Sequence, residues 1–271
     1  MHVRLLLELV VMGWNIAYNL PPVVAQPALV QQVDNRWPGQ NTASPPDNSQ
    51  SLTRTISLPG NITVGNSLVI LVCHFNAATN PGGTVSFTDN LGNTFPSATG
   101  RIDDLDASAN MSVYAFFMPR ITVGGAQTIT ATFPYLEWQS LLIMEWSGLA
   151  NQAPLDWNGS VQTATTTAND FLTTGNIAGG SNAGILIGHC LNGTDQNTAN
   201  GGGVGSPNCG TGFTAVNSGT TNWSGIENSF VGPACQPEYL YSSNLGTRAM
   251  TYTSKKAAES YVSIGMALKG A

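Results

Sequence analysis

The sequence predicts an all-β fold, a sandwich of two β-sheets of jelly-roll or immunoglobulin-like type that follows an extended N-terminal arm. The first observation is composition: the 271 residues include 30 Gly and 15 Pro, as a fold with many turns requires. The second is pattern, because short apolar or alternating runs recur between Gly, Asn and Pro. The third is that no convincing amphipathic helix follows residue 60.

Three of these runs are the clearest: two predict strands and one predicts a turn. Leu68 to Val72 is a continuous aliphatic segment, short enough for a strand that is buried on both faces. Thr84 to Asp89 alternates, so Val85 and Phe87 should face a core. Asn90 to Asn93 predicts a turn, since Gly and Asn tolerate positive φ.

Residues 1–25 have the features of a secretory signal. His2 and Arg4 give a weakly basic start, and Leu5 to Trp14 is an apolar stretch too short to span a bilayer. We expect this segment either to be cleaved on export or to remain as an apolar N-terminal segment. In neither case do we expect a stable membrane span.

The rest of the chain divides into an arm and a domain. Residues 26–51 are rich in Pro, Gln and Asn and predict an extended arm or linker. Residues 52–271 predict the sandwich, with a first strand at Leu52 to Leu58 and a long Gly/Asn-rich insertion at 192–236. SKKAAE at Ser254 to Glu259 predicts one short turn of helix.

Further segments have the length and pattern of strands, and most are bounded by Gly, Asn or Pro. The last of them should be a central strand, because its alternate residues are apolar. These segments are Met111 to Met118, Thr128 to Phe133, Leu141 to Ser147, Phe171 to Ile177, Gly184 to Leu191, Thr247 to Thr253 and Tyr261 to Leu268.

Several segments also carry a family resemblance. ITVGNSLVILV, VSFTDNLGNTF, VYAFFMPRITVGGAQTITATF, LLIMEWSGLANQAPLD and YVSIGMALK resemble those of a broad group of mostly uncharacterised bacterial secreted β-sandwich proteins. The resemblance covers about residues 55–190 and the C-terminal strand. It implies a β-sandwich in an extracellular or surface protein, and it transfers no catalytic residue.

The surface must be nearly free of charge. Only 9% of the residues are charged, whereas about a quarter is usual, and the formal net charge is -6. No basic stripe is present to neutralise phosphates, so we predict no nucleic-acid partner. Such a surface either stays soluble through neutral polar groups and glycans, or packs against copies of itself, where charges would need desolvation.

The even number of cysteines, four, predicts disulfides in an exported chain. Three connectivities are open. We favour Cys209 with Cys235, which would close the long insertion, and Cys73 with Cys190, which would join two predicted strands. Closing the first loop should stabilise the fold by about 3 kcal/mol. Four buried, reduced thiols are the alternative.

The pairs Cys73-His74 and His189-Cys190 invite a zinc interpretation. Neighbouring strand residues point to opposite faces, so a cysteine and its adjacent histidine cannot easily bind one ion. If the two strands pair, His74 falls beside His189 on the other face, but no third ligand is evident. We predict no metal site.

Catalytic patterns are weak. Glu137 and Glu145 could form a glycosidase pair only if they flanked a cleft. Asp103, Asp104 and Asp106 form the densest acidic cluster, which predicts a solvated loop rather than a calcium site. No nucleophile elbow, phosphate loop or dinucleotide fingerprint is present. We therefore predict no enzyme and no cofactor.

Two sets of residues could involve glycans. Aromatic side chains could stack on sugar rings, although aromatics in a sandwich more often fill the core. They are Trp138, Trp146, Trp157, Trp223, Tyr135, Tyr239 and Tyr241. N-x-[ST] sequons predict a glycoprotein in a suitable host. They begin at Asn61, Asn110, Asn158, Asn192 and Asn222.

These observations predict a non-enzymatic structural subunit of an extracellular or cell-surface assembly, such as a filament, sheath or surface layer. The arm of one subunit would add a strand to the open sheet edge of its neighbour, so the partners are copies of the same chain. Two alternatives stay open: a carbohydrate-binding or adhesive module, and a viral jelly-roll coat or spike protein.

Overall fold

The computed structural model describes residues 26–35, 51–75, 85–95, 101–106, 111–150, 159–165, 171–192, 208–209, 211–216, 234–253 and 260–271, some of them by backbone alone. Within these residues the regular elements are all β-strands and no helix is present. Every strand pair is antiparallel. The all-β prediction is therefore confirmed for this part of the chain.

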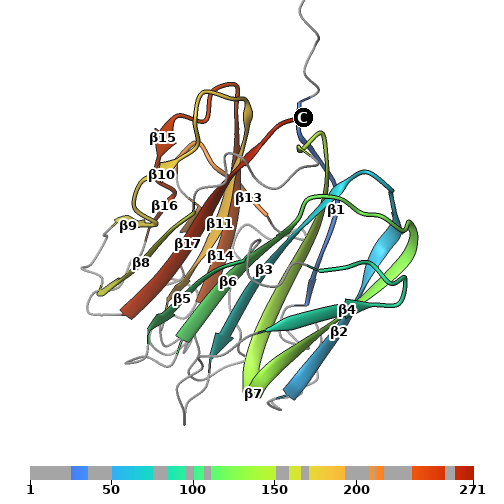
Figure 1. The fold of residues 1–271 in the computed structure, drawn as a ribbon. Helices are drawn as coiled ribbons and strands as arrows, with labels where there is room; N and C mark the ends of the chain where they lie inside the picture. Colours follow the sequence, from blue (N-terminus) through green and yellow to red (C-terminus); the bar gives the residue numbers. More distant parts are fainter. Residues whose placement is uncertain are drawn as a thin grey trace, which may run out of the picture.

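The central sheet runs in the order β1, β7, β3, β6 and β5 (Figure 1). Its middle strand is the predicted Leu68 to Val72 segment, whose residues are at most 1% exposed, as expected of a strand covered on both faces. The strands are β1 (Ala28–Asn35), β7 (Gly125–Ser147), β3 (Ser67–Phe75), β6 (Met111–Met118) and β5 (Arg101–Asp106).

A second sheet runs in the order β13, β14, β11, β17 and β8. Its strands are β13 (Thr214–Ala215), β14 (Ala234–Ser242), β11 (Gly184–Asn192), β17 (Ser260–Lys269) and β8 (Gly159–Thr165). β17 pairs on both sides, with β11 and β8, so the predicted central position of the last strand is confirmed.

One apolar cluster contains residues of both sheets. Val69 and Leu71 of β3 lie in it together with Ile185 and Ile187 of β11. The alternate apolar residues of β17 join them, namely Val262, Ile264, Met266 and Leu268. Alternate residues of each strand therefore form this shared core, as the two-residue period of a strand requires.

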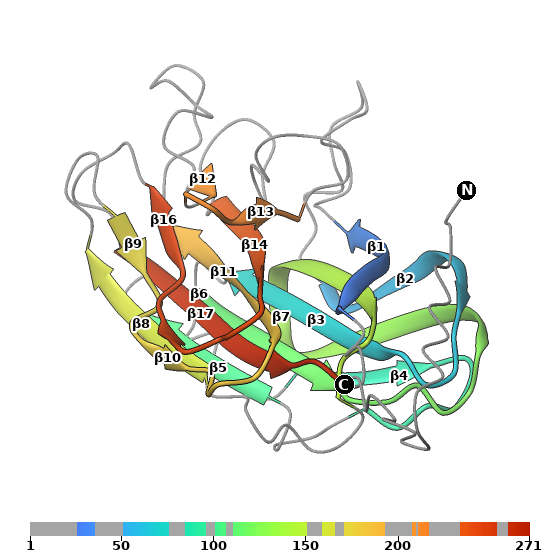
Figure 2. The same cartoon turned by 90° about the horizontal axis from the view of Figure 1, so that it is seen from above.

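β7 is 23 residues long and takes part in two layers. Its C-terminal half pairs with β1 and β3, while its N-terminal half pairs with β2 (Ser51–Ile62) on one side and β4 (Ser86–Asp89) on the other. Two views show this outer layer crossing the central sheet at one end of the molecule (Figures 1 and 2).

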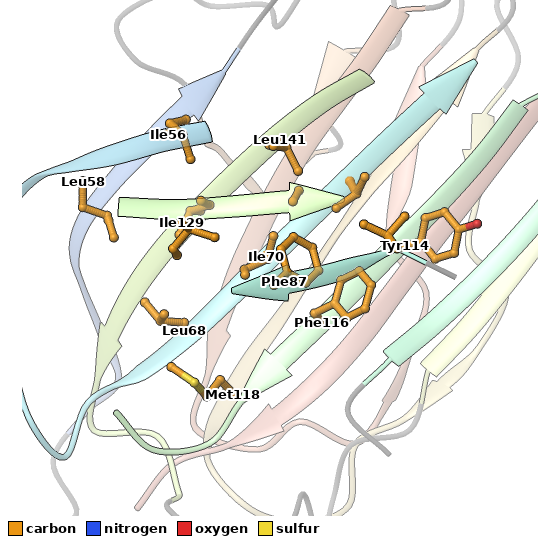
Figure 3. Packing of buried hydrophobic residues seen from close by; sticks show 14 of the residues in the cluster. Ile56, Leu58, Leu68, Ile70, Phe87, Tyr114, Phe116, Met118, Ile129 and Leu141 are labelled. Carbon is orange, nitrogen blue, oxygen red and sulfur yellow. The ribbon is translucent and has the colours of Figure 1, made fainter. Parts of the chain in front are cut away.

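A second apolar cluster fills the space below that outer layer. Ile56, Ile129 and Phe87, from its three strands, pack toward Leu68 and Phe116 of the central sheet (Figure 3). Phe87 and Phe116 meet edge to face, with ring centroids 4.6 Å apart. The apolar side of β2, β4 and β7 is thus buried, and their other side is left to solvent.

Short strands cover the far face of the second sheet. They are β9 (Phe171–Thr173), β10 (Ile177–Ala178), β12 (Asn208–Cys209), β15 (Thr247–Arg248) and β16 (Thr251–Thr253). Met250 lies between two of them and packs over Gly188 and Gly265, which are directly opposed in β11 and β17. The paired glycines leave the room that this side chain fills.

Several predicted strand bounds need correction. Thr128 to Phe133 and Leu141 to Ser147 are parts of one strand, β7. Phe171 to Ile177 and Thr247 to Thr253 are each divided between two short strands. The predicted solvated loop around Asp103 is wrong, because these residues form the edge strand β5.

The predicted arm also differs from the structure. Ala28–Asn35, inside the segment expected to be an arm or linker, forms strand β1 and pairs with β7 of the same chain. The first strand is therefore not Leu52 to Leu58, which belongs to β2. The predicted turn at Asn90 to Asn93 is confirmed, with Gly92 at a φ of 85°. The predicted helical turn at Ser254 to Glu259 lies outside the described residues.

Candidate functional site

The candidate site is the β1 seam, which we define as the contact of β1 with β7 and β2. β1 is the end strand of the central sheet and runs from Ala28, opposite Ser147, to Asn35, opposite Leu141. The register shifts between Leu29 and Gln31. A bulge of this kind leaves one residue out of the ladder, and Val30 at this position is 49% exposed.

β1 contributes little apolar burial to the seam. Leu29 packs against the core between the two large sheets, and Val33 packs against the core below β2 and β4. Both side chains are only partly buried. The strand is therefore held mainly by backbone pairing and by polar contacts.

A buried carboxylate stands at the centre of these polar contacts. Glu145 of β7 is 0% exposed. Its Oε1 accepts hydrogen bonds from the Thr63 backbone N–H at 2.9 Å and from the Asn66 side-chain amide at 2.6 Å. Its Oε2 accepts from the Gln31 side-chain amide at 2.6 Å. A buried carboxylate needs such donors to offset its lost hydration.

Gln31 carries the contact on to β2. Its Nε2 also lies 3.3 Å from the Asn61 carbonyl oxygen, and its Oε1 accepts the Gly60 backbone N–H at 2.8 Å. Both the donor and the acceptor of one amide side chain are thus used. Gln31 therefore joins β1 to both β7 and β2.

A second polar cluster closes the turn after β4. The Asp89 carboxylate accepts the backbone N–H groups of Leu91, Gly92 and Asn93, at 2.7 to 3.2 Å, and the side-chain amide of Gln127 at 2.7 Å. Asn93 donates to the same carboxylate, and its Oδ1 accepts from Thr122 and Val123.

The electrostatics of Asp89 follow from these contacts. Burial raises the pKa of the carboxyl group, because it disfavours the charged form. The hydrogen bonds donated by the Asn93 and Gln127 side chains and by the backbone of Asn93 and Gly92 lower the pKa. The lowering effects together prevail, so the pKa of Asp89 lies below its ordinary value.

The glutamates considered as a catalytic pair have different surroundings. Both lie in β7, and Glu137 is opposite Ser51 of β2. Glu145 is occupied by the seam contacts and is sealed from solvent. These hydrogen bonds account for the burial of Glu145, so a catalytic role is not needed to explain it.

The histidine pairing assumed for a metal site is absent. β3 lies between β6 and β7, whereas β11 lies between β14 and β17. His74 is opposite Ser112, and His189 is opposite Ile264. The described residues contain no group of three or more His, Cys, Asp or Glu side chains placed to hold a metal ion.

The two predicted cysteine pairs differ in outcome. Cys190 is buried with Leu186 on the face of β11 turned away from the central sheet, and β11 is not paired with β3, which carries Cys73. Cys190, whose side chain the structure describes, is not in a disulfide, so the predicted Cys73–Cys190 bridge is not formed, whereas Cys209 with Cys235 stays a prediction. Cys209 and Cys235 lie in β12 and β14, two strands that contact each other.

The aromatic residues that the structure describes with side chains serve the core. Trp146 is buried and meets Tyr239 edge to face, with centroids 5.1 Å apart. Tyr239 and Tyr241 pack partly buried against the core between the sheets. Trp146 therefore offers no face to a sugar ring, and the two tyrosines are partly used by the core. Trp138 and Tyr135 are described by backbone alone, and Trp157 and Trp223 lie outside the described residues.

The structure describes two of the five sequon asparagines. Asn61 is exposed in β2, and Asn192 is the last residue of β11. Asn110, Asn158 and Asn222 lie outside the described residues, so glycosylation stays a prediction.

Sequence reasoning missed Gln31 and the Asp89 cluster. LVQQVDN does not alternate between apolar and polar residues, so it carries only a weak strand signal, and its Pro- and Asn-rich surroundings favoured an arm. Asp89 is followed by Asn-Leu-Gly-Asn, a pattern typical of a side chain that caps its own turn.

Comparisons with known proteins give no counterpart. No family model matches the chain, and no curated protein or solved structure matches it significantly. The resemblance drawn from sequence motifs stays an expectation. The described residues include no helix long and apolar enough to cross a membrane.

Proposed function

We propose that the protein is a non-enzymatic structural subunit of an extracellular assembly, built on a two-sheet β-sandwich of jelly-roll or immunoglobulin-like type. Subunits join when β1, in the N-terminal arm, leaves its own β7 and adds to the β7 edge of a neighbouring copy. The assembly is a filament, sheath or surface layer that such additions extend.

The observation that carries this proposal is the β1 seam. β1 is an end strand, held by an aligned ladder and by the Gln31 side chain, with only two partly buried apolar side chains. An end strand that pairs with the equivalent β7 edge of another copy makes the same contacts there. Exchange therefore costs little enthalpy, as in domain swapping, while main-chain hydrogen bonds supply strength.

The segment between β1 and β2 determines how far an exchanged β1 could extend from its own subunit. Residues 36–50 join β1 to β2, so fifteen residues connect the exchanged strand to the body. A fully extended chain spans up to about 3.3 to 3.6 Å per residue, which gives about 50 Å.

Composition supports the same proposal. Only 9% of the residues are charged, so subunit contacts need little desolvation of ions. The signal-like segment, the sequons and the even number of cysteines favour the cell surface or the extracellular space. Copies of the chain are the proposed partner.

The test is electron microscopy of the full chain and of a variant that lacks residues 26–51. The full chain should form regular polymers, and the deletion variant should give dispersed particles. A Val30→Ala variant, changed at the exposed bulge residue, is the matched control and should still polymerise. Polymers of the deletion variant identical to those of the full chain would contradict the proposal, as would a full chain that never polymerises.

A further inference from the structure

The solvent side of β2, β4 and β7 carries a hydroxyl face, which we define as Thr53, Thr55, Ser57, Thr128, Thr130, Thr132, Ser86, Thr88 and Asn90. These residues are exposed, or half-buried in the middle strand. The opposite side of the same strands is the apolar cluster of Figure 3. The face therefore rests on a packed core.

The face is built in three rows across the strands. Thr132 of β7 is opposite both Thr53 and Ser86, and Thr130 is opposite both Thr55 and Thr88. The third row contains Ser57, Thr128 and Asn90: Ser57 is opposite Thr128, and Asn90 bonds the Thr128 backbone. Neighbouring strands lie about 4.8 Å apart, so the hydroxyl groups form a regular grid.

Hydrogen bonds within the grid orient its hydroxyl groups. Thr55 Oγ1 and Thr130 Oγ1 are 3.0 Å apart, and Ser57 Oγ and Thr128 Oγ1 are 2.9 Å apart. Each hydroxyl has one donor and two acceptor sites, so a bonded pair keeps capacity for outside partners. These groups are therefore already aligned for a ligand that displaces solvent from the face.

The chemistry of the face selects a class of partner. No member is charged, which removes any attraction for phosphates or other ions. No member is aromatic, Arg or Met, the residues that usually anchor protein partners. What remains is a flat, neutral array of groups that both donate and accept hydrogen bonds, as the hydroxyl groups of an uncharged polysaccharide do.

We propose that the hydroxyl face binds the surface of an uncharged, insoluble polysaccharide. One soluble sugar would gain only a few bonds, whereas an extended polymer surface engages the rows together. This function does not depend on polymerisation, because the face lies on β2, β4 and the N-terminal half of β7, and β1 pairs with the C-terminal half.

The test is a pull-down of the full chain with microcrystalline cellulose and, separately, with insoluble chitin. The Thr55→Val, Thr128→Val and Thr130→Val triple variant keeps side-chain shape and removes three hydroxyl groups. We expect the natural chain to bind at least one of the two solids and the triple variant to lose about tenfold in affinity. Thr94→Val, at an exposed loop residue, is the matched control and should bind like the natural chain.

Thermal unfolding of each variant shows that a loss of binding is not a loss of fold. A Thr130→Lys variant adds a charge to the middle of the grid and should also release the solid. Absence of binding by the natural chain to both solids would overturn the proposal. Equal binding by the triple variant and the natural chain would overturn it too. A natural chain that adsorbs to ice crystals but binds neither polysaccharide would also overturn it.

Discussion

Two buried or half-buried carboxylates hold distant parts of the chain together. Glu145 receives donors from Gln31, Thr63 and Asn66, which lie at least 79 residues away in sequence. Asp89 receives most of its donors from the next four residues. The first arrangement fixes strands to each other, and the second fixes a turn.

The Asp89 cluster makes a prediction about acid stability. The folded pKa lies below the ordinary value, so the charged carboxylate favours the folded state. This stabilisation is present above the unfolded pKa, about 3.9, and is lost as the pH falls through the lower folded value. Asp89→Asn should remove about 1 to 2 kcal/mol at pH 7, since the partly exposed site screens the charge.

Urea unfolding at pH 7 and at pH 3 measures the effect. The difference in unfolding free energy between the natural chain and Asp89→Asn should shrink toward pH 3 and below. Thr94→Ala in the neighbouring loop is the control and should behave like the natural chain at both values. An equal difference at every pH would show that the charge of Asp89 does not stabilise this turn.

At the scale of elements, local pattern predicts the strands whose environment is simple. β3, β6, β11 and β17 are buried on both faces or alternate cleanly, so their apolar residues identify them. β1 and β8 are rich in Gln, Ser and Thr and carry no comparable signal. They become strands because a neighbouring edge is available, which is tertiary information.

β7 shows a different limit. Pro134 normally predicts a break, because proline cannot donate to a ladder. Here it follows Thr132, which pairs with β2 and β4, and precedes Trp138, which pairs with β3. The ladder with β2 is irregular at this point, because its register shifts between Thr53, opposite Thr132, and Ser51, opposite Glu137, so the missing donor costs little. The hydroxyl face could not be predicted from the sequence either. The alternation of each strand is visible there, but which residues lie side by side depends on the register between the strands.

The glycine pair under Met250 gives a prediction at this scale. A Cβ added at Gly188 would overlap with the Ile264 carbonyl oxygen and lie 2.9 Å from the Met250 sulfur. Because the first of these is backbone, Gly188→Ala should lower stability by about 3 kcal/mol. At Gly60 the nearest atom is the Gln31 side-chain oxygen at 3.4 Å, so Gly60→Ala is the matched control.

Chemical unfolding midpoints of the two variants decide the matter. Gly188→Ala should unfold at clearly lower denaturant or fail to fold, while Gly60→Ala should stay within about 1 kcal/mol of the natural chain. If Gly188→Ala were as stable as Gly60→Ala, the close packing of the short strands on the second sheet would be refuted.

At the scale of the whole molecule, the described strands form packed layers with little charge. The end strand β1 is held by its backbone ladder with β7 and by the contacts of Gln31, with only two partly buried apolar side chains. The layers explain why Glu145 and the aromatics near it are structural, since buried clusters occupy both faces of the central sheet. Among the described residues, the two surfaces that we propose for partners are the β1 seam and the hydroxyl face. We therefore propose that the β1 seam serves assembly and that the hydroxyl face serves attachment.

The exchange of β1 between copies is the central claim. Ala28 and Ser147 are directly opposed at the start of the seam, and neither is buried. Chains carrying Ala28→Cys and chains carrying Ser147→Cys can form a disulfide between these positions only if β1 of one chain lies on β7 of another. The double variant, with both cysteines in one chain, should lock β1 in place and prevent assembly when oxidised.

The most direct measurement is therefore peptide mass spectrometry of the two single-cysteine chains, mixed, assembled and mildly oxidised. We predict a cross-linked peptide joining positions 28 and 147 in the polymer fraction, identified apart from links among the native cysteines. Polymers that contain no such link, while the double variant closes its own link and still polymerises, would contradict the account.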